Sequence, residues 1–468
     1  MGKITDIIDF SQDPLTIISS LKEKTISVPK WCYLREFYNP KEHPILKDTI
    51  NLRDKYRKDG SVEKSCRLSL PMERLLVKRM SEFMFSIPVK RVYGNTENNE
   101  TRQAIAKAIE AIYKYARVAT HNLQRSKEYF ACCEIFTLWY VVKSPNTLYG
   151  FNSEYKLKCK TFSPLNGTAL YPKFDEYGDM IAMSYEYTVK KAGTKSVTYF
   201  ETYTQDMHYK WANESDKWGL VGKPEEIEIL KIPGIYLPRE EAIYEDVSEI
   251  RKEIEYTFSR NSNVIAYNAA PVLKVIGKVI GEERNNEDYR FFRMEPGGDV
   301  SYVSWSQSIQ AIVEHISQMK EMFWSLSQLP DISFSNMQKL GNIGYDARET
   351  LLTDAHLKVG DESGAWIEFF ERETSVIKAF LKKMNTQWAD EIDNVEVEHI
   401  VTPFIQKNES AEISKRITAN GGKPIESQRE SIQRFGKSSD PDATLRQIRE
   451  EEAEEAQASI PDVFGSAN

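Results

Sequence analysis

The chain has 468 residues, of which 41% are hydrophobic and 28% charged, and its formal net charge is −8. This composition is ordinary for a soluble protein and leaves room for roughly two to four domain-sized units. The acidic balance excludes the chain-wide basic surface typical of proteins that grip nucleic acid, so any contact with DNA must be local.

Neither the cysteines nor the apolar runs indicate a secreted or membrane protein. The five cysteines are odd in number and form no CxxC pair, so reduced thiols are expected rather than a disulfide framework or a zinc site. The opening residues "MGKITDIIDF" lack the apolar core of a signal peptide. No apolar run approaches the roughly 18 residues of a membrane span, so no membrane partner is expected.

The first part of the chain is predicted to be helical and then rich in strands. Apolar residues recur at helical spacing in "LPMERLLVKRMSEFMFSIPV", where Pro88 ends the helix, and again in "AIAKAIEAIYKY". From about residue 136 the chain is rich in Tyr, Val and Thr, as in "FTLWYVVKS" and "MIAMSYEYTV", with turns at "DEYGD" and "KAG". This pattern is typical of an antiparallel sheet.

Two helical patterns then flank a small β element. Apolar residues at positions 243, 247, 250, 254 and 258 step by 4, 3, 4 and 4 and predict a helix over 240–260. Residues 270–303 are predicted to form short strands around the polar turn "GEERNNED" and the turn "EPGGD". A second helix is predicted from Ser306, with apolar residues at 309, 312, 316, 319, 323 and 326.

A polar loop, "LSQLPDISFSNMQKLGNIGYDARE" (residues 326–349), follows the second helix. Its only charges before Asp346 are Asp331 and Lys339. By itself, this composition favours a plain surface connection between two helices. From Asp346 a long helical pattern resumes, followed by a strand in "VEVEHIVTPF" and by helical pieces that end in an acidic tail.

No sequence motif indicates catalysis or a cofactor. "RFGKSSD" contains Gly-Lys-Ser, but the glycine that a phosphate-binding loop needs is Ser431 here, so a turn at a helix end is expected. An acidic cluster near residue 390 favours a solvated face over a metal site, because metal ligands must converge in space. The cluster consists of Asp390, Glu391, Asp393, Glu396 and Glu398.

The order of these elements resembles the core of the portal proteins of tailed bacteriophages, over roughly residues 30–455. Several stretches are similar to the family's habits: "WCYLREFYNPKEHPIL", "PMERLLVKRMSEFMFSIPVKRVYG", "VSEIRKEIEYTFSRNSNVIAYNAAPVLKVIG", "LSQLPDISFSN" before "GNIGYDA", and the tail from "NESAEISKRITANGG" onward. The turn at Gly344-Tyr345 departs from the pair of small residues usual in the family.

The resemblance implies an α+β portal fold divided into named parts. The parts are an N-terminal arm and wing (1–238), a first stem helix (239–266), a small β clip (267–304), a second stem helix (305–328), a tunnel loop (329–346), a long wing helix with a strand (347–400), and a helical crown with a flexible acidic tail (401–468).

The resemblance also implies a function without catalysis. About twelve copies would form a ring at one vertex of the capsid, and double-stranded DNA would pass through it during packaging and ejection. Further partners implied are the terminase motor, the head-completion or adaptor proteins, and the major capsid and scaffolding proteins. The protein would assemble in the host cytoplasm and reside in the virion.

Two sets of residues are predicted to contact partners. Tunnel-loop residues would face the DNA channel: Ser335, Asn336, Gln338, Lys339 and Asn342. Clip residues would dock the partner proteins: Glu282, Glu283, Arg284, Asn285, Asn286 and Asp288. Two alternatives stay open, namely a metal-dependent enzyme that processes nucleic acid at the acidic cluster, and another head-tail connector protein of a phage.

Overall fold

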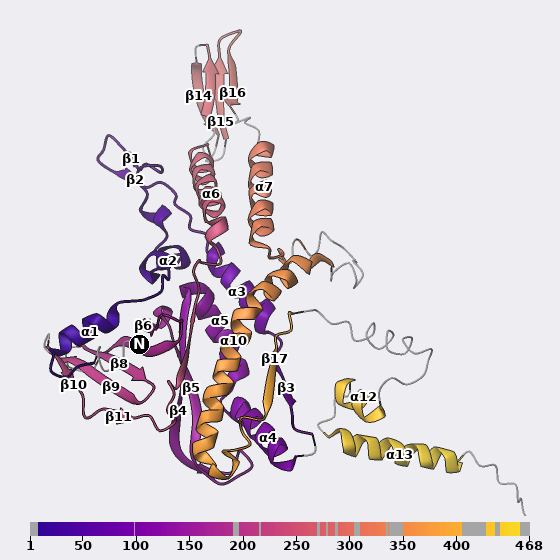
Figure 1. Cartoon of the computed structure of the whole chain (residues 1–468). Helices are drawn as coiled ribbons and strands as arrows, with labels where there is room; N and C mark the ends of the chain where they lie inside the picture. Colours follow the sequence, from indigo (N-terminus) through magenta and orange to yellow (C-terminus); the bar gives the residue numbers. More distant parts are fainter. Residues whose placement is uncertain are drawn as a thin grey trace, which may run out of the picture. The chain divides into compact units, whose positions relative to one another are not determined.

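The structure is a computed structural model that describes residues 8–97, 99–190, 196–214, 217–268, 272–277, 279–285, 289–303, 309–333, 336, 350–404, 427–435 and 440–458. The chain divides into two compact units, residues 1–342 with 350–404, and residues 343–349 with 405–468. Helices and antiparallel strands occupy separate stretches, so the predicted α+β class is confirmed (Figure 1).

The α-helices of the first unit form much of its N-terminal part, and the last of them is a long helix that crosses its core. They are α1 (Pro14–Lys22), α2 (Trp31–Tyr38), α3 (Met72–Phe85), α4 (Glu100–Tyr115), α5 (Val118–Cys132), α6 (Ser248–Asn268), α7 (Ile309–Ser327) and α10 (Thr353–Met384). Short 3₁₀ turns are η2 (Pro44–Lys47), η3 (Pro164–Asn166), η4 (Glu245–Val247) and η5 (Thr386–Trp388).

Helix α4 shows how local sequence sets a helix and its buried face. Asn99 precedes the first turn, and its side chain accepts a hydrogen bond from the Arg102 N–H (3.1 Å), which satisfies one of the free donors at the helix start. Ile105, Ile109 and Ile112 recur on one face and are fully buried. The helical stripe predicted for this segment is therefore confirmed.

The strands between Glu134 and Pro238 form two antiparallel sheets. The first has the order β12-β4-β5, from β4 (Glu134–Asn146), β5 (Ser153–Phe162) and β12 (Gly234–Pro238). The second has the order β10-β9-β8-β7-β6, with β11 also paired to β9. Its strands are β6 (Ala169–Phe174), β7 (Met180–Val189), β8 (Val197–Thr204), β9 (Met207–Glu214), β10 (Lys217–Leu220) and β11 (Glu225–Glu226).

One glycine allows β12 to lie close against β4. A Cβ atom at Gly234 would lie 2.4 Å from the ring of Phe136, a separation that side chains do not tolerate. Glycine is therefore required where the two strands pair, at the register Gly234 to Leu138.

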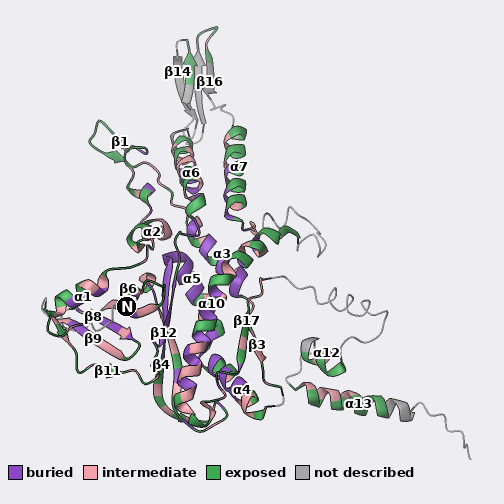
Figure 2. Cartoon of the chain, in the orientation of Figure 1, coloured by how far each residue is buried: buried purple, intermediate pink, exposed green. Residues whose placement is uncertain are grey.

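The long helix α10 runs through the centre of the main core. It packs against α3, β12 and β17 (Glu396–Ile400), and β17 in turn pairs with β3 (Lys90–Gly94). Trp366 is fully buried, and its ring contacts Phe85 (4.9 Å between centroids) and Tyr129 (5.4 Å). Figure 2 shows the buried stripe along this helix. Burial of such large aromatic side chains supplies much of the stability of a core.

A buried ion pair links α5 to α10. The Arg125 guanidinium donates to both carboxylate oxygens of Glu373 (2.7 and 3.1 Å), and Trp139 Nε1 donates to the same carboxylate (3.1 Å). Both charged side chains are almost completely buried. The bidentate geometry and the extra donor offset the cost of removing both charges from water.

The stem helices follow the predicted order but not the predicted boundary. Helix α6 has the expected 21 residues, yet it begins at Ser248 instead of residue 240. Ile243 and Val247 belong to a turn and to η4, and they are buried in the main core. The prediction of a helix start at 240 is wrong because a 3₁₀ turn repeats apolar residues at nearly the same spacing.

The β element between α6 and α7 consists of two antiparallel pairs, one nested inside the other. β13 (Val272–Ile276) pairs with β16 (Asp299–Val303), and β14 (Val279–Asn285) pairs with β15 (Tyr289–Met294). The predicted polar turn "GEERNNED" is wrong for its first half, because residues 281–285 continue strand β14 in register with β15. A polar strand carries no alternation of apolar residues, so its sequence resembles a turn.

The second unit contains two described helices, α12 (Gln428–Phe435) and α13 (Pro441–Ala458). Arg429 donates two hydrogen bonds to the carboxylate of Asp442 (2.6 and 3.0 Å), which joins the two helices. Asp440 caps α13 by accepting from the N–H groups of Asp442 and Ala443 (both 3.0 Å). The helical pieces predicted near the C-terminus are confirmed for these residues.

Within the described residues, no helix carries an apolar stretch long enough to span a bilayer.

The buried pair between α5 and α10 yields a stability prediction. Glu373→Ala leaves Arg125 charged and without its carboxylate in the core. The free energy of unfolding, measured by urea titration, should therefore fall by about 3–5 kcal/mol. Glu368→Ala is the matched control, because Glu368 on the same helix pairs with Arg372 at the surface and should contribute less than about 1 kcal/mol. Equal losses for the two variants would contradict this account of the pair.

Candidate functional site along the stem

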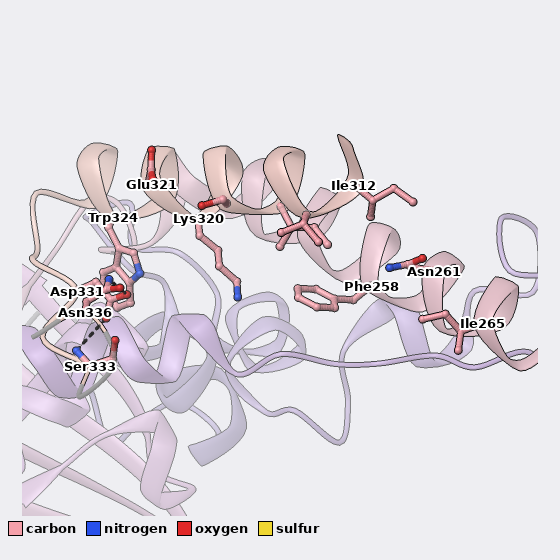
Figure 3. A pocket seen from close by; sticks show the side chains of 13 residues that line it. Phe258, Asn261, Ile265, Ile312, Lys320, Glu321, Trp324, Asp331, Ser333 and Asn336 are labelled. Carbon is pink, nitrogen blue, oxygen red and sulfur yellow. Dashed lines mark hydrogen bonds between the residues drawn. The ribbon is translucent and has the colours of Figure 1, made fainter. Parts of the chain in front are cut away.

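The two stem helices enclose a groove that continues to the start of the predicted tunnel loop. Helices α6 and α7 lie side by side and antiparallel, with the β element joining their far ends (Figure 1). The stem groove has a volume of about 650 Å³. Its walls come from Phe258, Asn261 and Ile265 of α6, and from Val313, Ile316 and Trp324 of α7. Figure 3 shows Phe258, Asn261 and Ile265 on one side of the groove and Trp324 on α7.

One cation bridges the two walls of the stem groove. Lys320 of α7 extends toward α6, and its Nζ lies 5.2 Å from the centroid of the Phe258 ring (Figure 3). An ammonium group at this distance from an aromatic face is attracted by the electron-rich ring. Lys320 therefore ties α7 to α6 while most of the groove surface remains apolar.

An extended segment, residues 65–70, runs along another face of α6. We call it the strap. Its alternate backbone N–H groups donate to three side chains of α6: Cys66 to Asn263 Oδ1 (2.6 Å), Leu68 to Ser259 Oγ (2.9 Å) and Leu70 to Glu255 Oε1 (2.6 Å). Residues spaced by four lie above one another on a helix, so they match every second residue of an extended chain. Alternate backbone N–H groups of the strap are thereby hydrogen-bonded to one face of α6, much as a strand is hydrogen-bonded to a neighbouring strand.

The lower end of the strap meets a buried group of four ionisable side chains. We call it the ionic cluster: His43, Glu73, Arg251 and Glu255, all at most 2% exposed. Arg251 pairs with both carboxylates, through Nη1 to Glu255 (2.7 Å) and through Nε to Glu73. His43 Nδ1 lies 2.8 Å from Glu255 and its Nε2 lies 2.5 Å from the Phe37 carbonyl oxygen.

Burial and charge act in opposite directions on the two carboxylates of the ionic cluster. Burial alone would raise the pKa of Glu255, but hydrogen bonds from His43 and from the Leu70 N–H, with the charge of Arg251, lower that pKa below its usual value. For Glu73 burial dominates and raises the pKa, although Arg251 opposes it. Glu255 is therefore the carboxylate of the cluster whose ionised form its neighbours stabilise.

The end of α7 is held in place from the long helix. Lys358 of α10 donates to the Ser327 carbonyl oxygen (2.7 Å), which satisfies one of the free acceptors at the end of α7. Gln328 adopts a left-handed conformation (φ 54°) and Leu329 is buried, so the chain leaves the helix in a fixed direction. Burial lowers the pKa of Lys358.

Asp331 organises the first residues of the predicted tunnel loop. Its carboxylate accepts from the Ser333 N–H (3.0 Å) and from Asn336 Nδ2 (2.6 Å), as Figure 3 shows at the lower end of the groove. Of the five predicted channel residues, only Asn336 is described, and it is half-buried. Ser335, Gln338, Lys339 and Asn342 lie outside the described residues.

The predicted docking residues of the clip fall on a strand. Glu282, Glu283, Arg284 and Asn285 belong to β14, opposite Phe292, Phe291, Arg290 and Tyr289 of β15. Asn286 and Asp288 lie outside the described residues. The sequence thus placed these residues at the far end of the stem helices but missed that most of them form part of a hairpin.

The acidic cluster near residue 390 is distributed among different partners. Glu391 accepts from Arg102 Nε (2.7 Å), Asp393 pairs with Lys382, and Glu396 accepts from Asn95 Nδ2 (2.8 Å). In the described part of the chain, no three His, Cys, Asp or Glu side chains converge in a way that could hold a metal ion. These carboxylates join wing elements to one another, which is a structural role.

A helical stem interrupted by a β element and mounted on an α+β wing is the architecture expected of a portal protein. The model of the family "Phage portal protein, SPP1 Gp6-like" matches residues 22–458 of the sequence. The chain belongs to this family of phage portal proteins, which are structural components of the phage particle.

Three solved structures that resemble the chain come from gene transfer agent (GTA) particles. The neck of an empty GTA particle, computed with C6 symmetry, has 12% identity and a TM-score of 0.41 over 77% of this chain and 89% of that chain. The virion of a native GTA particle has 10% identity and a TM-score of 0.38 over 90% and 98%. The neck of a native GTA particle, computed with C12 symmetry, has 13% identity and a TM-score of 0.33 over 78% and 94%. No curated protein matches the sequence.

The strap yields a prediction for hydrogen exchange. Asn263→Ala removes both side-chain hydrogen bonds to Cys66, so the Cys66 amide should exchange about five to ten times faster, as expected for the loss of about 1 kcal/mol. The Leu70 amide should keep its protection, because its partner Glu255 is untouched. Asn261→Ala, on the groove face of the same helix, is the matched control and should leave the Cys66 amide unchanged.

Proposed function

We propose that this portal protein assembles into a ring of about twelve copies at one vertex of the capsid, and that double-stranded DNA passes through the ring. The observation that carries the proposal is the surface of α7. One face of this helix packs on α6, yet Val313, Met322 and Leu326 are each more than half exposed. A stem helix with apolar residues on several sides needs further neighbours, and other copies of the chain supply them.

The charge of the chain suits a conduit that DNA slides through. Twelve copies at −8 each would carry 12 × −8 = −96 formal charges. DNA is bound tightly by proteins that place many Lys and Arg side chains against its phosphates, and such contacts would slow its passage. A ring with this charge repels DNA more than it grips it.

Chemical work on DNA would then belong to partners. In this proposal the terminase motor supplies the ATPase and nuclease, and it docks on the clip, as head-completion or adaptor proteins do later. The major capsid and scaffolding proteins surround the wing and crown. Assembly takes place in the host cytoplasm, and the finished ring stays in the virion. Three of the five carboxylates near residue 390, those of Glu391, Asp393 and Glu396, have structural partners, which favours this proposal over a metal-dependent enzyme.

The ring itself is tested by its mass and its shape. Twelve chains of 54.1 kDa give about 650 kDa, so the purified protein should show a mass in this range by mass photometry. End-on views in negative-stain electron microscopy should show a ring with a central opening. A protein that stays monomeric or dimeric at micromolar concentration, in the presence of scaffolding and capsid proteins, would contradict the proposal.

The tunnel loop is tested by shortening it. If residues 329–346 line the channel, a deletion of Asn336 to Asn342 should leave ring assembly intact but reduce DNA packaging, or retention of packaged DNA, by about tenfold or more. Lys339→Ala is the matched control: it removes a single weak phosphate contact per copy, so rings should form and packaging should change less than about twofold. Normal packaging by the deletion variant would show that the loop is only a connection. Loss of the ring would instead make it a subunit contact.

A further inference from the structure

An exposed hairpin, formed by β1 (Lys55–Tyr56) and β2 (Val62–Glu63), lies near the stem (Figure 1). Its turn is well specified: Arg57 N–H donates to the Ser61 carbonyl (2.9 Å), and Gly60 takes the left-handed conformation (φ 81°) that the turn requires. Two strands of two residues each are not stable by themselves in water. The hairpin therefore has the form of an element that is completed by another surface.

The hairpin presents an apolar pair to solvent. Tyr56 and Val62 lie directly opposite each other across the two strands, and they are 81% and 46% exposed. Figure 2 shows the hairpin as exposed throughout. A large aromatic residue left in water on a hairpin is typical of a contact residue, because its burial contributes strongly to association.

The stem groove offers a matching surface with no occupant among the described residues. Phe258 and Ile265 of α6 and Val313 of α7 line it, and Val313 is 56% exposed. A volume of about 650 Å³ is sufficient for an aromatic side chain and its apolar neighbour. Lys320 and Glu321 at its wall and Asp331 at its end supply polar partners at the rim.

The hairpin cannot reach the groove of its own chain. The strap begins directly after the hairpin and is fixed to α6 by Glu255, Ser259 and Asn263. The groove residues of α6 are Phe258, Asn261 and Ile265, which face about a third of a turn away around the helix. In Figure 1 the hairpin and α7 accordingly lie on opposite sides of α6. Both surfaces lie along the same stretch of α6, residues 255–265.

The charges of the two surfaces are complementary. Between residues 55 and 64 the hairpin has four basic side chains (Lys55, Arg57, Lys58, Lys64) and two acidic ones (Asp59, Glu63), a balance of 4 − 2 = +2. Lys320, Glu321 and Asp331 give the groove a balance of 1 − 2 = −1. Opposite charges at the rim of an apolar contact set its orientation and exclude wrong partners.

From these observations we infer that the β1–β2 hairpin of one copy docks into the stem groove of the next copy, with Tyr56 seated beside Val313. The inference deepens the proposed function and rests on it, since the partner is a second copy within the ring. Two different faces of one stem meet in this contact, so the interface is heterologous. A heterologous contact forms a ring where its rotation closes, whereas a contact between identical faces stops at a dimer.

Cysteine cross-linking tests the contact directly. In a chain whose exposed native thiol is removed (Cys32→Ser), Tyr56→Cys is combined with Val313→Cys, and assembled particles are treated with a short thiol-reactive cross-linker. Both positions are exposed, so neither substitution removes a buried contact. Denaturing gels should show a ladder from dimer upward in which more than about half of the chains are linked. Each single variant in the same background, which also controls for the other native cysteines, should stay monomeric.

The matched control replaces Tyr56 by another exposed tyrosine. Tyr177, 77% exposed in the turn between β6 and β7, is changed to cysteine and combined with Val313→Cys. This pair should give no ladder. A ladder of equal strength from the control, a link within single chains, or rings of the Tyr56→Cys and Val313→Cys chain without cross-links would overturn the hairpin contact and leave the ring intact.

Assembly of charged variants separates this inference from the proposed function. Tyr56→Glu puts a charge into the apolar contact and should reduce the fraction of chains in rings at least fivefold, whereas Tyr177→Glu should assemble like the parent chain. Unchanged assembly of Tyr56→Glu would count against the contact. If the parent chain itself forms no ring, the proposed function fails, and the inference falls with it.

Discussion

The position of the stem depends on the ionic cluster of His43, Glu73, Arg251 and Glu255. These residues come from the N-terminal arm, from α3 and from α6, and all of them are buried. Charges removed from water are costly unless every one of them is paired, so the arm, the wing and the stem must be in place together. The pairing makes the position of α6 depend on the N-terminal segment, although the two are about 200 residues apart in the sequence.

His43 joins the N-terminal arm to α6 within the ionic cluster. Both ring nitrogens face oxygen atoms, one from the Phe37 carbonyl and one from the Glu255 carboxylate. Glu255 occupies the centre, because it accepts from His43, Arg251 and the strap at the same time.

The strap extends this arrangement up the stem. Side chains of α6 spaced by four residues satisfy alternate backbone groups of residues 66–70, so one face of the helix is covered by the chain itself. The face toward α7 forms the stem groove, and much of α7 remains exposed. The stem is therefore asymmetric, with one side closed by the strap and hairpin and the other side open. A ring of identical subunits joined by heterologous contacts needs two different contact faces on each subunit, and the two sides of the stem differ in this way.

Periodicity and composition in the sequence were sufficient for the order of the elements, for the buried face of α4 and for the strand-rich segment after residue 134. These features depend on residues close together in the chain, where helices and strands leave a repeat of 3.6 or 2. The start of α6 and the extent of β14 were mispredicted, because a 3₁₀ turn mimics helical spacing and a polar strand mimics a turn. Only the tertiary structure decided the strap, the ionic cluster and the Arg125–Glu373 pair. The strap contacts, the His43–Glu255 contact and the Arg125–Glu373 pair join residues that are 185 to 248 positions apart. A single hydrogen bond or ion pair over such a distance leaves no repeating pattern in the sequence.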